Sequence, residues 1–169
     1  MGVNVELRYS WQYGAAFSAS AELQTMISGW YETGTEIVFA CGGSMFSSIV
    51  AAASANDACV VGVDVDQSFE SETVVTSALK GLSAATAWAI DKFYAGEWET
   101  IGNVPTTLGA NNDSVGLPTE TWSLTGWTVE EYNALLAAIK DGSLVVDNAV
   151  LENDGVAGVE FSNLKVIYE

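Results

Sequence analysis

The chain has 169 residues, of which 49% are hydrophobic, and its mean hydropathy of +0.24 is typical of a folded globular protein rather than a disordered acidic chain. Its net charge is −17, with 22 acidic residues against five basic ones, so nucleic acid and anionic membrane surfaces are poor partners. Histidine is absent, which removes the commonest general base and the commonest metal ligand. The length predicts a single domain, 1–169.

The first third of the chain alternates strands with helices. The stretch Val3–Tyr9 predicts a first strand, followed by an aromatic loop over Ser10–Ala19 and a helix from Ala21 to about Glu32. Repetition of this alternation predicts an α/β fold with a doubly wound, mostly parallel sheet and flanking helices.

Residues 36–67 form the centre of that pattern. The apolar runs Glu36–Cys41 and Ala58–Asp64 are near-continuous, which predicts two buried parallel strands. The Ala-rich stretch Met45–Ala55 between them is long enough to be the crossover helix that parallel strands require.

In the second half of the chain, the predicted strands and helices follow one another less regularly. A capping box at Thr128–Glu131 marks the start of a helix that runs to Lys140. The other predicted elements are a turn at Gln67–Thr73, a strand at Val74–Ser77, a helix from about Ser83 to Tyr94, loops over 97–118 with short strands at Thr106–Leu108 and Val115–Leu117, and late strands at Leu144–Val150 and Glu160–Tyr168.

The two cysteines raise the question of a disulfide, and the amino-terminal residues raise that of a targeting signal. Cys41 and Cys59 fall in the predicted buried strands, where small apolar core residues are the favoured interpretation and a disulfide stays open. Met1–Tyr9 has neither a basic region nor a long apolar run, so it does not resemble a signal peptide. No stretch reaches the length of a membrane span.

Polar and glycine residues gather where the predicted parallel strands end, which is where ligands bind in open α/β sheets. Gly42 and Gly43 form a tight turn that lets a ligand approach the backbone, although the turn is not a GxGxxG fingerprint. Asp64 closes an apolar strand and needs a partner, which a ligand's vicinal hydroxyls would supply. Lys80 is expected at the same edge, either as a salt-bridge partner or as a ligand group. Asp66 is either a second ligand residue or a solvated turn residue.

Aromatic residues in the first loop complete the candidate site. Phe17 and Trp11 can stack on a flat ring or a sugar face, or be buried in the core. Catalysis has little support, because no serine or cysteine has a histidine partner and no pair of carboxylates has a distinctive spacing. We therefore expect no catalytic residues, no metal and no cofactor.

The segments WYETGTEIVFACGGSMFSSIVAAA, VVGVDVDQS, TVVTSALKGL and LGANNDSVGL resemble the C-terminal part of the basic membrane protein family. These are the PnrA-like purine-nucleoside-binding lipoproteins of bacterial ABC importers. The resemblance covers most of residues 5–140. It implies one lobe of a type I periplasmic-binding-protein-like fold, in which two α/β lobes close on a nucleoside. The chain would then be a fragment or a truncated form of a two-lobed protein.

The resemblance also implies roles for residues. Asp64 would bind ribose hydroxyls with Lys80 beside it, Gly42 and Gly43 would line the cleft, and Phe17 would stack on the base. The loop QYGAAFSAS departs from the family pattern, which makes Trp11 the substitute for Phe17.

The implied partners are a small-molecule ligand and, for the full-length protein, an ABC permease. The implied location is extracytoplasmic, as a membrane-anchored lipoprotein, although this chain shows no lipid-modified cysteine. A half-cleft rimmed by aromatic residues could also self-associate.

Three other interpretations stay open. A sugar or another hydroxylated solute would use Asp64 in a similar way. A regulatory member of the same family would bind a ligand without transport. A nucleotide- or NAD-dependent enzyme is opposed by the missing GxGxxG, P-loop and histidine.

Overall fold

The structure of the chain is a computed structural model that describes residues 3–146 and 162–169. The strands are β1 (Val5–Tyr9), β2 (Ile37–Phe39), β3 (Cys59–Asp64), β4 (Val74–Lys80), β5 (Val115–Gly116) and β6 (Leu164–Tyr168). The helices are α1 (Ala21–Glu32), α2 (Met45–Ala55), α3 (Leu82–Tyr94) and α4 (Val129–Asp141), with single 3-10 turns at Gly14–Ala16, Trp98–Thr100 and Ala110–Asn112.

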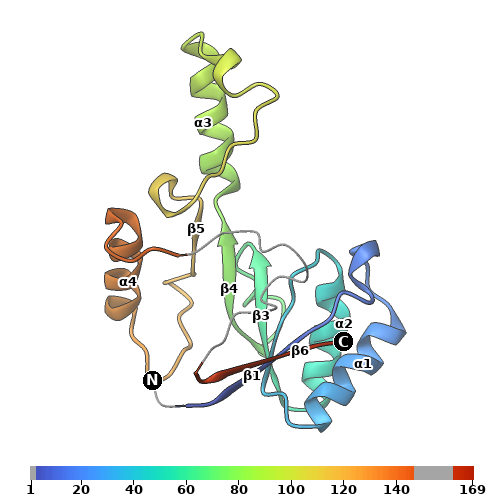
Figure 1. Ribbon diagram of the computed structural model, residues 1–169. Helices are drawn as coiled ribbons and strands as arrows, with labels where there is room; N and C mark the ends of the chain where they lie inside the picture. Colours follow the sequence, from blue (N-terminus) through green and yellow to red (C-terminus); the bar gives the residue numbers. More distant parts are fainter. Residues whose placement is uncertain (1–2, 147–161) are drawn as a thin grey trace.

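The main sheet has the strand order β2-β3-β4-β5. β2, β3 and β4 are parallel, and β5 pairs with the end of β4 in the antiparallel direction. In Figure 1, β3 and β4 lie side by side with their carboxyl ends pointing the same way. The predicted fold class, α/β with a mostly parallel sheet and flanking helices, is therefore confirmed.

The core lies between this sheet and the packed pair α1 and α2. The buried residues of α1 are spaced four positions apart, as expected for one side of an amphipathic helix. α2 also buries residues on the side that faces α1 and the sheet. Ser48 of α2 joins the two helices, because its Oγ accepts from Ser20 N–H (2.9 Å) and donates to Ser20 O (3.0 Å). The core residues are Leu23, Ile27, Tyr31, Val38, Ala40, Phe46, Ile49, Ala52, Ala53, Val60 and Val74.

The prediction that the first strand belongs to the main sheet is wrong. β1 pairs in parallel with β6 in a separate two-stranded sheet, with Val5 opposite Leu164 and Tyr9 opposite Tyr168. Figure 1 shows β1 and β6 crossing the molecule together. An alternating pattern predicts a strand but not its partner, and here the partner lies at the other end of the sequence.

The prediction that Glu36–Cys41 is a fully buried strand is also wrong. β2 is only three residues long and lies at the edge of the main sheet. Val38 faces the core, whereas Ile37 and Phe39 are 47% and 51% exposed. Cys41 follows the strand and is exposed, Cys59 is half-buried, and both cysteines are free thiols.

The remaining differences concern the later elements. β4 continues to Lys80 rather than ending at Ser77, because β5 pairs with its last residues. Thr106–Leu108 forms no strand, and neither does the described part of the predicted strand Leu144–Val150. Positions 147–150 and 160–161 of the two late predicted strands lie outside the described residues. The predicted short strand at Val115–Leu117 is confirmed as β5.

Helix α3 packs against little of the described chain. It rises from the end of β4 and points away from the sheet (Figure 1), and none of its residues is buried. We call residues 81–114 the α3 arm. Its base is closed where Gly81 N–H donates to Ser114 O (2.8 Å), beside the pairing of β4 with β5.

The capping box of α4 gives a test of local stability. Glu131 N–H donates to Thr128 Oγ1 (3.2 Å) and Thr128 N–H donates to Glu131 Oε2 (2.8 Å). We expect Thr128→Ala to lower the free energy of unfolding by about 1 kcal/mol, because it removes the acceptor for a helix N-terminal amide. Urea denaturation measures the change, with the exposed Thr125→Ala as control. Equal stability of the two variants would contradict the prediction.

Candidate functional site

Three neighbouring strands bring predicted residues to one edge of the main sheet. Gly42 and Gly43 follow β2, Asp64 ends β3, and Lys80 ends β4. Neighbouring strands are about 4.8 Å apart, so the three strand ends lie within about 10 Å of one another. We call these four residues and Phe17 the strand-end site.

Asp64 and Lys80 form an ion pair, with 2.9 Å between Asp64 Oδ1 and Lys80 Nζ. The side chains are 41% and 62% exposed, so the pair lies at the surface, where it adds little stability. Both groups can therefore reach a ligand from solvent. The sequence placed the two residues at the same edge, and the structure brings them into direct contact.

The backbone of Asp64 is in the left-handed region, with φ 70°. A residue other than glycine seldom adopts this conformation, although aspartate and asparagine do so more readily than most. The turn from β3 into Val65 imposes it, and it sets the direction of the carboxylate at the strand end. Such backbone strain is common at binding sites.

Phe17 is held against the glycine turn by its main chain. Its carbonyl oxygen accepts from Ser44 N–H (3.2 Å) and from Ser44 Oγ–H (3.0 Å). A Cβ added to Gly43 would lie 3.3 Å from Phe17 O and 3.6 Å from Phe17 Cβ, so the two residues are in close contact. The Phe17 residue is 62% exposed, which leaves its ring free to contact a ligand.

Trp11 does not take the same position. It is exposed in the turn after β1, where its carbonyl oxygen accepts from Gly14 N–H. The atoms nearest to Gly43 come from Phe17. Phe17, and not Trp11, is therefore the aromatic residue that lies next to the Gly42–Gly43 turn.

Asp66 has a structural role that the sequence left open. Its Oδ1 accepts from Ser68 N–H (3.0 Å) and its Oδ2 accepts from Thr121 Oγ1–H (2.7 Å). Burial acts to raise the pKa of Asp66, but the hydrogen bonds from Thr121 and Ser68 outweigh it and hold the pKa below its usual value. Both carboxylate oxygens of Asp66 therefore bond to other residues of the chain and hold the turn after β3.

Gln67 and Ser77 also support this turn, and the sequence reasoning missed them. Gln67 Oε1 accepts from Val63 N–H (2.8 Å), and the fully buried Ser77 Oγ accepts from Gln67 N–H (3.0 Å). A Cβ on Gly62 would lie 2.6 Å from Ser77 Oγ and 2.8 Å from Gln67 Oε1. A glycine inside a strand was the available signal, because it often marks a close approach by another group.

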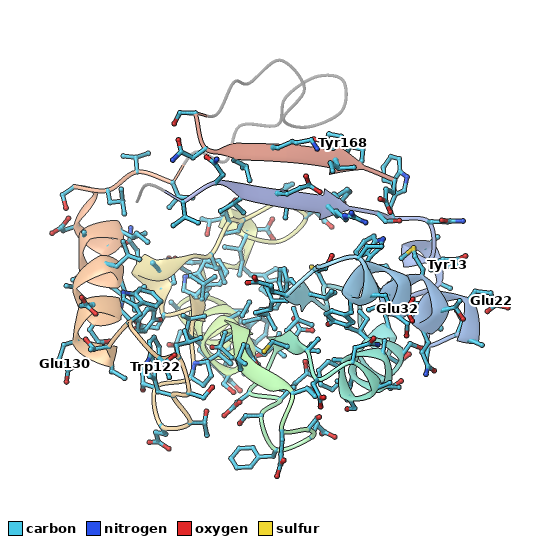
Figure 2. The ribbon with its side chains drawn as sticks, turned by 90° about the horizontal axis from the view of Figure 1, so that it is seen from below. Tyr13, Glu22, Glu32, Trp122, Glu130 and Tyr168 are labelled. Carbon is cyan, nitrogen blue, oxygen red and sulfur yellow. The ribbon has the colours of Figure 1, made fainter. Side chains whose placement is uncertain are left out.

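Two surface hollows lie beside α1 and the loop before it, and the second is lined by residues on both sides of Phe17 in the sequence. One of about 420 Å³ is lined by Tyr13, Ala21, Glu22, Thr25 and Met26, and one of about 320 Å³ is lined by Tyr13, Glu22 and the loop residues before α1. Figure 2 shows Tyr13 and Glu22 at the outside of the molecule beside α1. Neither hollow includes Asp64 or Lys80, and we do not assign them a ligand.

The described ranges, 3–146 and 162–169, contain no group of three or more acidic, cysteine or histidine side chains placed to hold a metal ion. Within the same ranges, no helix has the length and apolar character needed to cross a membrane.

Comparison with known proteins finds likeness in structure alone. No protein-family model matches the chain, and no curated protein matches it. The fold is similar to an ABC transporter solute-binding protein from Conexibacter woesei DSM 14684, with a TM-score of 0.52 and 19% identity, over 76% of this chain and 43% of that protein. A solute-binding protein of an ABC transporter system from Aeropyrum pernix K1 gives a TM-score of 0.43 and 19% identity, over 71% of this chain and 37% of that one.

The chain therefore spans less than half the length of these solute-binding proteins. At 19% identity, the likeness to the Conexibacter protein shows that the chain shares the fold of part of a solute-binding protein.

The contacts of Asp66 predict a dependence of stability on pH. Because the folded pKa lies below the ordinary value of 3.8, the ionised carboxylate stabilises the fold above that pH. The stabilisation is lost as the pH falls through the folded pKa. Between about pH 5 and pH 3, urea midpoints should fall more steeply for the wild type than for Asp66→Asn or Thr121→Ala. Parallel curves for all three proteins would show that these hydrogen bonds do not set the pKa of Asp66.

Proposed function

We propose that the chain is a ligand-binding lobe of the solute-binding component of a bacterial ABC importer, and that its ligand is a purine nucleoside. One observation carries the proposal: the Asp64–Lys80 ion pair and the Phe17–Gly43 contact occupy the ends of adjacent strands in a fold shared with a solute-binding protein.

The contacts support a division of roles. Asp64 accepts hydrogen bonds from two ribose hydroxyls, which a single carboxylate can do. Lys80 holds the Asp64 carboxylate in place and can donate to a ribose oxygen. The exposed ring of Phe17 stacks on the base, and the backbone of Gly42 and Gly43 lets the ligand lie close to the turn.

The strand-end site is exposed to solvent, as one wall of a cleft between two lobes would be when the other lobe is absent. The Phe17 and Lys80 side chains are exposed, and neither described hollow includes the site. A second lobe would supply the opposite wall and most of the desolvation, so this chain alone should bind weakly. The proposal includes an extracytoplasmic location as a lipoprotein, delivery of the ligand to an ABC permease, and no enzymatic step.

A sugar is the second candidate, because the Asp64–Lys80 pair binds hydroxyl groups whether or not a base is present, and aromatic rings stack on sugars as well as on bases. A regulatory protein that binds the same ligand without transport would have the same site.

Self-association through the exposed half-cleft is a further alternative that the sequence raises. Such a contact would bury Phe17 and Lys80 of the strand-end site.

A ligand panel tests the proposal. We would titrate the chain with adenosine, guanosine, inosine, a pyrimidine nucleoside and ribose, and follow binding by calorimetry and tryptophan fluorescence. We expect saturable binding of the purine nucleosides and weaker binding of the pyrimidine nucleoside. Binding of ribose with equal strength would favour the sugar alternative. A lack of binding by both this chain and a form joined to a second lobe would contradict the nucleoside proposal.

A further inference from the structure

Helix α3 presents an apolar side that nothing in the described chain buries. Leu82, Ile90 and Phe93 project from one side of the helix, because residues spaced by eight and eleven positions fall on the same side at 3.6 residues per turn. All three are about half exposed. At the tip, Phe93 contacts the rings of Tyr94 and Trp98, which are also exposed.

The main sheet presents a matching surface. Val38 and Val60 face the core beneath α1 and α2, so their neighbours along each strand face the opposite side. These neighbours are Ile37 and Phe39 of β2, which lie beside Cys59 and Val61 of β3. Ile37 and Phe39 are exposed and the other two are half-buried. We call these four residues the open sheet face.

Parallel sheets are usually covered by helices on both faces. This chain has one sheet face without a helix and one helix without a packing partner, so the apolar side of such a helix could cover the open sheet face. The α3 arm cannot easily cover the open sheet face of its own chain. α3 continues away from the sheet beyond β4 (Figure 1), and the arm's base is closed by the Gly81–Ser114 hydrogen bond and the pairing of Lys80 with Val115. Folding back would have to open this base and reverse the chain at Gly81.

We propose that two copies of the chain exchange their α3 arms, so that α3 of each copy packs on the open sheet face of the other. The arm needs no rearrangement at Gly81 for this, because it already points out of its own molecule. The inference does not depend on the proposed ligand.

The net charge of −17 makes two copies repel each other, so a second copy can bind only through surfaces of low charge. The only charged residues of α3 are Asp91 and Lys92, whose charges cancel, and the open sheet face has none. At the tip of the arm, Lys92 also pairs with Glu97 and Glu99 lies next to Trp98, so the arm brings some negative charge to a sheet face that has none, and no like charges meet.

The area is adequate for a stable dimer. The three exposed aromatic residues of the arm, Phe93, Tyr94 and Trp98, can remove roughly 300–400 Å² of surface from water. A reciprocal exchange buries two arms and two sheet faces, for a total of roughly 1,200–1,600 Å², which is the size of a standard specific interface.

Sedimentation velocity across the micromolar range tests the proposal with three double variants. The arm variant is Ile90→Glu with Phe93→Glu, and the face variant is Ile37→Glu with Phe39→Glu. The control is Val65→Glu with Phe69→Glu, which adds the same charge at exposed residues of the turn after β3. Circular dichroism verifies that each variant folds.

We expect a concentration-dependent dimer for the wild type and the control, and monomers for the arm variant and the face variant. An equal mixture of those two variants keeps one intact exchange and sets glutamates against glutamates in the other, so it should associate more weakly than the wild type. If the face variant fails to fold, the arm variant and the control still decide the question. A monomeric wild type, or a dimer that survives in the arm variant, would overturn the proposal. A dimer lost only in the control would place the contact at the cleft face instead and would equally overturn it.

Discussion

Replacing Asp64 with asparagine is expected to weaken purine-nucleoside binding about 10- to 100-fold while leaving the fold intact. A hydrogen bond to a charged group contributes about 1.5–3 kcal/mol, and each 1.4 kcal/mol is a factor of ten in affinity. Asparagine has the same shape and tolerates the left-handed backbone, so the fold is kept while one of the two acceptor oxygens becomes an NH2 donor and the charge that pairs with Lys80 is lost. Calorimetric titration of wild type and variant measures the ratio of dissociation constants.

Asp57 gives a matched control for this experiment. It is an exposed aspartate that also has a positive φ of 49°, but it lies before β3, at the opposite end of the strand from Asp64. Asp57→Asn changes the net charge by the same amount and should leave nucleoside affinity unchanged. Equal losses in both variants would show that long-range charge, and not contact with Asp64, governs binding.

Two further substitutions separate the backbone of Asp64 from its carboxylate. Asp64→Gly and Asp64→Ala both remove the carboxylate, so both should lose affinity. They should differ in stability, because alanine at a φ of 70° costs about 1–2 kcal/mol that glycine does not. Urea denaturation measures this difference. An alanine variant as stable as the glycine variant would show that the turn can relax out of the left-handed conformation.

The second large effect is expected at Gly81, at the base of the α3 arm. A Cβ there would lie 2.5 Å from Asp113 O and 2.6 Å from Ser114 Cα, which are backbone atoms that cannot move alone. We expect Gly81→Ala to lower the free energy of unfolding by about 3 kcal/mol and to separate β5 from β4. The urea midpoint and the amide exchange rate of Ser114 and Val115 measure the two effects.

Gly29 is the matched control, because it lies within α1 and a Cβ there would meet no atom within 4 Å. Gly29→Ala should stabilise the chain by about 0.5–1 kcal/mol, as alanine does in a helix with free space around it. A stabilising Gly81→Ala would mean that residues 113–114 yield readily and that the base of the arm is not closed.

Local patterns in the sequence predicted the elements well. α1 and α2 occupy the predicted ranges, and the capping box placed the start of α4 at the correct residue. Caps and apolar periodicity are properties of neighbouring residues, so one sequence is enough to read them. The position of Asp64 and Lys80 at one edge of the sheet also followed from topology, since the ends of parallel strands meet there, but the ion pair between them was only one of the alternatives.

Features that depend on distant partners were not predictable. The alternation in Val5–Tyr9 indicates a strand, but the sequence does not show that residues 164–168 pair with it. The burial of Ile37 and Phe39 was overestimated because apolar runs also occur in edge strands whose second face is open. The bonds of Asp66 with Thr121 and of Gln67 with Ser77 join residues 55 and 10 positions apart, beyond the reach of local motifs.

The pairing of β1 with β6 has a consequence for the order of folding. Glu6 and Lys165, which bond across this pair, are 159 positions apart, so forming it closes a loop that contains almost the whole polypeptide. The entropy of that closure must be met before the ladder returns any stability, which delays such contacts in folding. We therefore expect β1 and β6 to join after the β2–β5 sheet has formed and to separate first on unfolding. The strand ends that carry Asp64 and Lys80 would then keep their native arrangement while the two ends of the chain come apart.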